Sequence, residues 1–201
     1  MLIVGLTGPS GAGKGVVASL FSRLGVPSVD TDRVYHDLLV PPSPCLEELK
    51  ERFGPEILFP DGALNRGALA SLVFSEGHGE DLADLNRITH RHILAKTRDI
   101  LSAYEAQGIP AVLVDAPQLF ESGFDRECGF ILSVLAPFEM RLARVMARDG
   151  LSEERAKARL EVAHTDDFFR ERSDAVMINN GEVDSMESEV RRLLTLWGVT
   201  V

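Results

Sequence analysis

The sequence predicts an α/β protein with a parallel sheet and a helical insertion, and three observations support this fold class. Short apolar runs typical of buried strands alternate with helical spacing near both ends of the 201-residue chain. A glycine-rich loop joins the first apolar run to the first helical pattern. Between the second and third apolar runs, roughly sixty residues have helical spacing and lack the pattern of a buried strand.

The glycine-rich loop follows the first expected strand, Leu2–Leu6, and precedes a helical pattern over Val16–Phe21. It fits the pattern G-x-x-x-x-G-K, in which glycines let backbone N–H groups point at a bound phosphate. Lys14 can reach the outer phosphates, and the helix N-terminus adds partial positive charge. The alternative is an ordinary tight turn, but the position between a first strand and a helix favours a phosphate site. The predicted phosphate-binding residues are Gly8, Pro9, Ser10, Gly11, Ala12, Gly13, Lys14, Gly15 and Val16.

The second expected strand, Pro27–Val29, ends in the acidic segment Asp30-Thr31-Asp32. Open α/β sheets place ligands at the carboxyl ends of their strands, so these carboxylates are candidates for chemistry. They are equally suited to cap the helix expected over Arg33–Leu39. Both interpretations stay open, and one aspartate can cap the helix while the other faces a site.

The inserted region begins after the chain-breaking segment Pro41–Pro44. Its expected helices are Leu46–Phe53, Leu64–Phe74 and Asp81–Gln107, with a break at Gly77-His78-Gly79. We expect this insertion to cover the site.

The alternating pattern then resumes with a strand over Ile109–Asp115, which ends in an acid. Asp115 can hold Mg²⁺ through water, or it can be a residue of a strand-end turn. Two further strands and a final amphipathic helix follow, at Phe130–Leu135, Ala175–Ile178 and about Asp184–Leu196.

Three arginines at helical spacing, Arg141, Arg144 and Arg148, lie between the last two strands. Such a stripe is usually a solvated face, but arginines downstream of a phosphate loop also stabilise a phosphoryl group in transfer. Ser152 is expected to cap the next helix, which runs toward a polar stretch suited to a mobile lid.

The composition is that of a soluble globular protein, with 45% hydrophobic and 26% charged residues. A net charge of −10 argues against a general nucleic-acid or acidic-membrane binder. Cys45 and Cys128 form no CxxC pair and are expected to be reduced thiols. With no expected signal peptide and no membrane-spanning run, the predicted location is the cytoplasm, and no oligomeric state is predicted.

Several separated motifs resemble those of the dephospho-CoA kinases, P-loop kinases that complete coenzyme A synthesis. The matching segments are Gly5–Gly8, Asp30–Asp32, Leu64–Arg66, Val73–Phe74, Leu85–Ile93, Pro117–Glu121, Arg144–Asp149 and Asn179–Gly181. The chain departs from the family pattern at Gly15-Val16 (usually Ser-Thr), Arg91 (Pro), Gln118 (Leu) and Arg141 (Gln). The phosphate loop itself is similar to that of adenylate and cytidylate kinases.

The resemblance implies a P-loop NTPase three-layer sandwich with a five-stranded parallel sheet, an inserted helical substrate domain and a lid. The expected nucleotide-binding core is residues 1–40 plus 108–201, with the lid at about 141–173 and the acceptor-binding insertion at 41–107. The implied reaction transfers the γ-phosphoryl group of ATP to the ribose 3′-hydroxyl of dephospho-CoA.

By the same resemblance, Asp32 is the general base, and Lys14, Arg144 and Arg148 complete the catalytic set. Asn179 joins the ATP-binding residues and borders the adenine. The expected acceptor-binding residues are Thr7, Asp32, Asn65, Arg66, His90, Pro117 and Leu119. The expected cofactor is Mg²⁺ bound with ATP, with Asp32 and Asp115 as candidates for indirect contact because Gly15 supplies no hydroxyl.

Two alternatives remain at this stage. The spelling of the phosphate loop fits a nucleoside-monophosphate kinase. The absent hydroxyl at Gly15 and Val16 fits a nucleotide-binding module whose metal site has decayed. A histidine such as His90, taken alone, is more often a helix-packing or surface residue than a ligand-binding one.

Overall fold

The computed structural model describes residues 1–74 and 79–199, which form two compact units. The core unit comprises Met1–Asp30 and Tyr104–Val201, and the helical unit comprises Thr31–Ala103. The helical unit therefore begins directly after the second strand, about ten residues before the boundary expected from the proline-rich segment. Of the expected break at Gly77-His78-Gly79, the first two residues lie outside the described part of the chain.

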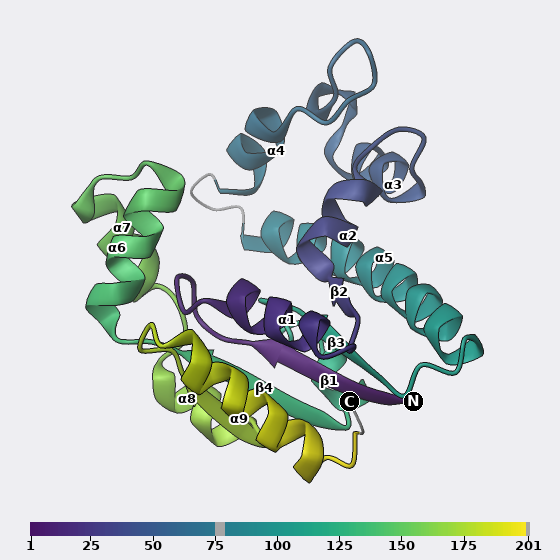
Figure 1. The fold of residues 1–201 in the computed structure, drawn as a ribbon. Helices are drawn as coiled ribbons and strands as arrows, with labels where there is room; N and C mark the ends of the chain where they lie inside the picture. The colour runs from purple at the N-terminus through teal and green to yellow at the C-terminus, as the bar shows by residue number, and fades with distance from the viewer. Residues whose placement is uncertain (75–78, 200–201) are drawn as a thin grey trace. The chain divides into compact units, whose positions relative to one another are not determined.

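The core unit contains a parallel sheet of five strands, as the sequence predicts (Figure 1). The strands are β1 (Leu2–Thr7), β2 (Ser28–Asp30), β3 (Ala111–Asp115), β4 (Phe130–Leu135) and β5 (Ala175–Ile178). Their order across the sheet is β2-β3-β1-β4-β5. The strands β2 and β3 therefore lie on one side of β1, and β4 and β5 lie on the other. Open α/β sheets place ligands at the carboxyl ends of the strands where the strand order changes side in this way.

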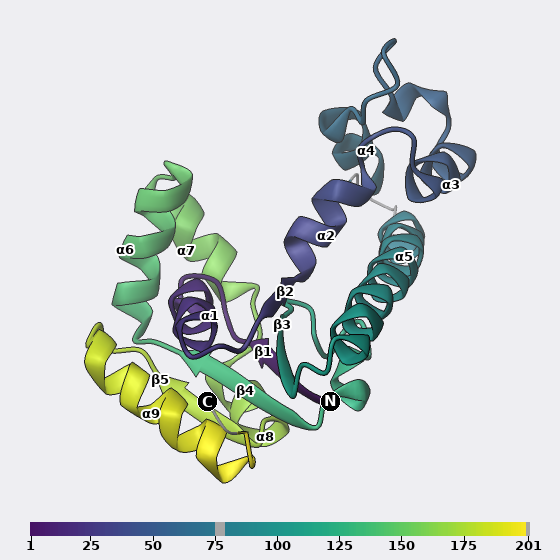
Figure 2. The same cartoon turned by 45° about the vertical axis from the view of Figure 1, so that its right-hand side comes forward.

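One face of the sheet is covered by α1 (Lys14–Arg23) and α9 (Val183–Leu196) (Figure 2). Alternate strand residues face these helices, because strand side chains point to opposite faces in turn. Members of this core include Val4, Leu6, Leu113, Leu132, Val134, Phe21, Met186, Val190, Leu193 and Leu194. The predicted apolar stripe of the last helix is therefore confirmed.

The strand register brings three carboxyl ends to one level of the sheet. Leu6 of β1 pairs with Asp115 of β3, and Asp115 in turn pairs with Asp30 of β2. The phosphate loop, which starts two residues after Leu6, and these two aspartates therefore share one edge of the core unit.

Three helices of the core unit lie between β4 and β5 in the sequence, α6 (Phe138–Asp149), α7 (Glu153–Glu161) and α8 (Asp166–Arg172). A short 3₁₀ turn, η2 (Phe124–Glu127), precedes β4. Gly150 ends α6 at a positive φ of 64°, and the Ser152 hydroxyl accepts the Arg155 N–H to begin α7. The helix-capping prediction for Ser152 is confirmed.

The helical unit consists of α2 (Thr31–Leu38), α3 (Pro44–Phe53), η1 (Pro55–Ile57), α4 (Arg66–Val73) and most of α5 (Gly79–Ala106). No strand forms among its described residues beyond one antiparallel bridge between Leu58 and Leu64. Its own core contains Leu39, Cys45, Leu49, Phe53, Ile57, Leu69, Val73 and Ile88. Burial raises the pKa of the Cys45 thiol to about 11, so this cysteine is a protonated core residue. No helix among the described residues is both long and apolar enough to cross a bilayer.

Candidate active site

The phosphate loop runs from Gly8 to the first turn of α1 with its backbone N–H groups largely uncommitted. Within the described residues, the amides of Gly11, Gly13 and Gly15 donate to no backbone carbonyl. Gly8 and Gly13 hold φ angles of 137° and 97°, which residues with a Cβ rarely adopt. The loop therefore offers several donors and a helix N-terminus to an anion, as the sequence predicts for a phosphate site.

Two side chains from distant parts of the chain hold the outside of this loop. The Asn179 amide nitrogen, Nδ2, donates to the Ala12 carbonyl at 2.8 Å. The Arg144 guanidinium donates to the Gly11 and Ala12 carbonyls at 3.2 and 3.3 Å, and to Asn179 Oδ1 at 3.3 Å. Asn179, predicted to bind ATP, and Arg144, predicted to be catalytic, both contact the loop itself in this structure.

Lys14 lies in the first turn of α1, and its Nζ donates to the Gly8 carbonyl at 3.0 Å. The ammonium group is thus folded back over the start of the loop. A flexible four-carbon stem lets the same group turn to a bound phosphate.

Arg148 is held by its neighbour in the sequence. Its Nε and Nη2 donate to the two carboxylate oxygens of Asp149 at 2.7 and 2.8 Å, and Nη2 reaches Ser10 Oγ at 3.4 Å. Arg159 of α7 donates to Asp149 Oδ2 at 2.8 Å. The hydrogen bond from Arg148 holds the pKa of Asp149 below its usual range, so one carboxylate binds two guanidinium groups.

Sequence reasoning missed Asp149 and Arg159 as parts of this cluster. The sequence signal that could have revealed the cluster is the short turn between α6 and α7, where Gly150 ends one helix and Ser152 caps the next. Such a short connection packs the second helix against the first. The resulting cluster carries a net charge of +1 beside a loop residue, which suits an anionic ligand.

Arg141 differs from the other two arginines of α6. It is only 9% exposed, and its Nη2 lies 3.6 Å from Asp166 Oδ1 at the start of α8. Its guanidinium carbon lies 5.8 Å from the centre of the Phe138 ring. Arg141 therefore joins α6 to α8, whereas Arg144 and Arg148 reach the phosphate loop.

Of the acceptor-site predictions in the core unit, Thr7 and Leu119 lie in the interior. Thr7 is fully buried, and its hydroxyl donates to the Pro117 carbonyl at 3.4 Å. Leu119 is also fully buried and packs next to Gly5. Both hold the segment after β3 against β1, and their side chains are unavailable to a ligand in this structure.

In the helical unit, Asn65 caps α4, because its Oδ1 accepts the Ala68 N–H at 3.1 Å. The exposed Arg66 donates through Nη2 to His36 Nδ1 at 2.7 Å. A guanidinium has five N–H donors, and this hydrogen bond uses one of them. His90 is half-buried on α5. Asp32 is exposed in the first turn of α2, two residues beyond the end of β2.

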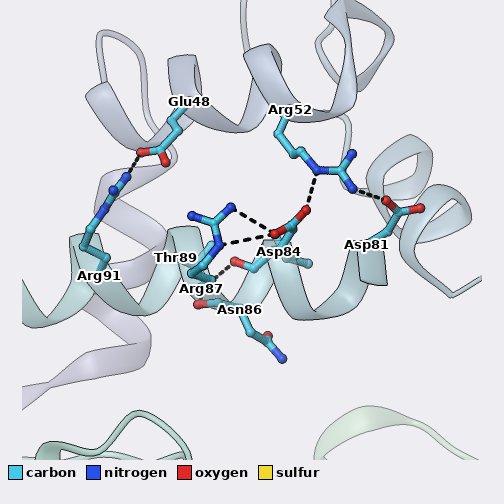
Figure 3. Close-up of polar contacts among 9 residues, drawn as sticks. Glu48, Arg52, Asp81, Asp84, Asn86, Arg87, Thr89 and Arg91 are labelled. Atoms are coloured by element: carbon cyan, nitrogen blue, oxygen red, sulfur yellow. Dashed lines mark hydrogen bonds and ion pairs between the residues drawn. The ribbon is translucent and has the colours of Figure 1, made fainter. Parts of the chain in front are cut away.

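A polar network joins α3 to α5 within the helical unit (Figure 3). Arg52 of α3 donates to Asp84 and Asp81, at 2.6 and 2.5 Å, and Glu48 pairs with Arg91 and His92. Hydrogen bonds from His92 and Arg91 lower the pKa of Glu48, with the His92 bond the largest cause. Arg91 stands where the family pattern has proline, and α5 continues through this position. The Arg91 side chain donates from α5 to Glu48 of α3.

Comparison with known proteins identifies relatives along nearly the whole chain. A family model described as dephospho-CoA kinase matches residues 2–185. The dephospho-CoA kinase of Syntrophotalea carbinolica is 38% identical over 194 residues, which cover 96% of this chain and 91% of that protein. The dephospho-CoA kinase of Corynebacterium efficiens is 37% identical over 194 residues, which cover 96% of each chain.

Solved structures also match nearly the whole chain. A structure from Thermus thermophilus matches with a TM-score of 0.80 at 35% identity over 96% of each chain. The dephospho-CoA kinase from Campylobacter jejuni matches with a TM-score of 0.69 at 25% identity, over 96% of this chain and 95% of that one. A shikimate kinase from Acinetobacter baumannii, with a TM-score of 0.53 at 16% identity, shares the fold.

Proposed function

This chain belongs to the dephospho-CoA kinase family, and we propose that it transfers the γ-phosphoryl group of ATP to the ribose 3′-hydroxyl of dephospho-CoA. The product is coenzyme A, so the reaction is the last step of coenzyme A synthesis. The family assignment favours this reaction over the nucleoside-monophosphate kinase suggested by the spelling of the loop.

The observation that carries this proposal is the built phosphate loop. Among the described residues three of its amides donate to no backbone carbonyl, two of its carbonyls accept from Asn179 and Arg144, and Arg148 reaches Ser10 within it. Phosphoryl transfer needs little covalent chemistry from the protein, since positioning and charge stabilisation supply most of the rate. This loop and its arginines provide both.

In the proposed mechanism, Asp32 accepts the proton of the 3′-hydroxyl as that oxygen attacks the γ-phosphorus. The new oxygen–phosphorus bond forms as the bond between the γ-phosphorus and the bridging oxygen breaks, and ADP leaves. Lys14 turns from the Gly8 carbonyl to the phosphates. Arg148, oriented by Asp149, stabilises charge on the transferring group.

Kinases of this type use a divalent metal with ATP, and we propose Mg²⁺. Bound Mg²⁺ neutralises phosphate charge, and it takes few protein ligands because it keeps waters and substrate oxygens. The described residues contain no cluster of three potential metal ligands, and Gly15 and Val16 offer no hydroxyl. We propose Asp115, which pairs with Leu6 of the strand that leads into the loop, and Asp32 as the carboxylates that would hold the ion through water.

For the acceptor, we propose that Arg66 and His90 of the helical unit bind the anionic and polar groups of dephospho-CoA. Asn65 supports them by starting α4 immediately before Arg66. We further propose a cytoplasmic location, where ATP and dephospho-CoA are available.

The experiment is an acceptor panel with the purified full chain, ATP and Mg²⁺. ADP release is measured with dephospho-CoA, AMP and CMP. We expect turnover with dephospho-CoA and little with either nucleotide. Preference for AMP or CMP would instead indicate a nucleoside-monophosphate kinase, and ATP binding without transfer to any acceptor would indicate a binding module.

A further inference from the structure

We propose that Asn179 is a positioning residue, which fixes the direction of a phosphate-loop amide and does not contact the adenine. This inference rests on the proposed ATP site at the loop. It reassigns a residue that the sequence pattern places beside the nucleotide base.

The hydrogen bonds of Asn179 leave little of its side chain for a base. Asn179 is 2% exposed, and its Oδ1 accepts from the Gly181 N–H at 3.0 Å and from Arg144 at 3.3 Å. Its Nδ2 donates to the Ala12 carbonyl. An amide oxygen has two acceptor positions, so both are used here, and only one N–H remains.

The effect on the loop follows from the planarity of the peptide bond. In a trans peptide, the carbonyl of one residue and the N–H of the next point in opposite directions. Holding the Ala12 carbonyl toward Asn179 therefore aims the Gly13 N–H at the opposite side. That N–H is one of the loop amides that donate to no backbone carbonyl in the described chain.

Asn179 is itself firmly placed, since its backbone N–H donates to the Leu135 carbonyl at 2.7 Å just beyond the end of β5. A Cβ built on Gly13 would lie 2.1 Å from Asn179 Nδ2. The side chain thus packs directly against the loop, and only glycine at residue 13 allows this contact. Asn179 therefore links the end of the sheet to the loop, through its backbone on one side and its side chain on the other.

The test compares inorganic tripolyphosphate with ATP, because tripolyphosphate has the phosphates and lacks the adenine. Binding of each is measured by calorimetry for the wild-type protein, Asn179→Ala and Asn179→Ser. The matched control is Asn180→Ala, since Asn180 is exposed and its Oδ1 accepts the nearby Glu182 N–H. Melting temperatures verify that each variant is folded.

A positioning role predicts that Asn179→Ala weakens tripolyphosphate and ATP by the same factor, about tenfold or more, because the Ala12 carbonyl loses its 2.8 Å hydrogen bond and keeps only the longer one from Arg144 at 3.3 Å. Asn179→Ser is expected to fall between this variant and the wild type, and Asn180→Ala is expected to bind normally. Weakened ATP binding with unchanged tripolyphosphate binding would overturn the inference and return Asn179 to the adenine.

A crystal structure of the wild-type protein with ATP tests the same point without a variant. We expect Nδ2 of Asn179 to remain on the Ala12 carbonyl, and a turn of the amide to the adenine ring would refute the inference. Both experiments omit dephospho-CoA. A wild-type chain that binds tripolyphosphate but phosphorylates no acceptor would thus refute the proposed function and leave this inference standing.

Discussion

Substituting the two neighbouring glycines of the phosphate loop should have opposite effects. Gly13 has a φ of 97°, and a Cβ there would lie 2.1 Å from Asn179 Nδ2. Gly15 lies in the first turn of α1, and a Cβ there would meet nothing within 4 Å. Gly13→Ala and Gly15→Ala therefore add the same methyl group two residues apart, in a strained site and in an open one.

The magnitude follows from two costs at Gly13. A left-handed backbone costs alanine about 1–2 kcal/mol. Displacing Asn179 leaves the Ala12 carbonyl short of a partner, which costs about 1–3 kcal/mol. The sum of about 2–5 kcal/mol is a large fraction of a typical stability of about 5–15 kcal/mol. At Gly15, alanine should instead gain about 0.5–1 kcal/mol, because glycine is unfavourable within a helix.

The assays are thermal unfolding and ATP binding by calorimetry on both variants and the wild type. Gly13→Ala should melt at a lower temperature because of this cost, and it should bind ATP at least about tenfold more weakly because the displaced Asn179 no longer fixes the direction of the Gly13 N–H. Gly15→Ala should melt at the same or a higher temperature. If Gly13→Ala matched the wild type in both assays, the contact between Asn179 and the loop would not have the importance given to it here.

Three further variants test other parts of the site. Asp32→Asn should keep ATP binding and lower kcat by about a hundredfold or more, the usual scale for loss of a general base, and near-normal turnover would exclude that role. Asp149→Asn should lower kcat by about twofold to tenfold with little change in melting temperature, because it releases Arg148, which is proposed to stabilise charge on the transferring group; an unchanged kcat would contradict that function. The folded-state pKa of Glu48 lies below its ordinary value of 4.5, so its stabilisation is present above pH 4.5 and is lost as the pH falls through the folded pKa. The melting-temperature difference between the wild type and Glu48→Gln should therefore shrink on acidification, and a constant difference from pH 7 to pH 3 would refute this pairing.

Local sequence signals predicted the elements whose formation depends on nearby residues. The strands Phe130–Leu135 and Ala175–Ile178 match the structure to the residue, because each is a largely apolar run that a turn or breaker residue ends, Pro137 shortly after the first and Asn179 after the second. The long helix α5 and the apolar face of α9 also followed from periodicity. The structure also confirmed that the five expected strands form one parallel sheet.

Contacts between distant residues were not predictable from local pattern. Asn179 and Ala12 are 167 positions apart, and the pairing of β1 with β4 and of β4 with β5 brings them together. Leu119 was assigned to the acceptor site because it lies in a matching motif, yet an apolar residue in such a motif can equally serve the core. The helical unit starts at Thr31 because α2 follows β2 without a linker, and no composition change marks that point.

The most direct test of the proposed reaction is the position of the new phosphate in the product. The full chain is incubated with ATP, Mg²⁺ and dephospho-CoA, and the product is purified and examined by proton and phosphorus NMR. We predict a phosphate monoester coupled to the proton on the ribose 3′ carbon, with one ADP formed per product. A phosphate at another position, or ADP formed without a phosphorylated acceptor, would contradict the assignment of this site to 3′-hydroxyl phosphorylation.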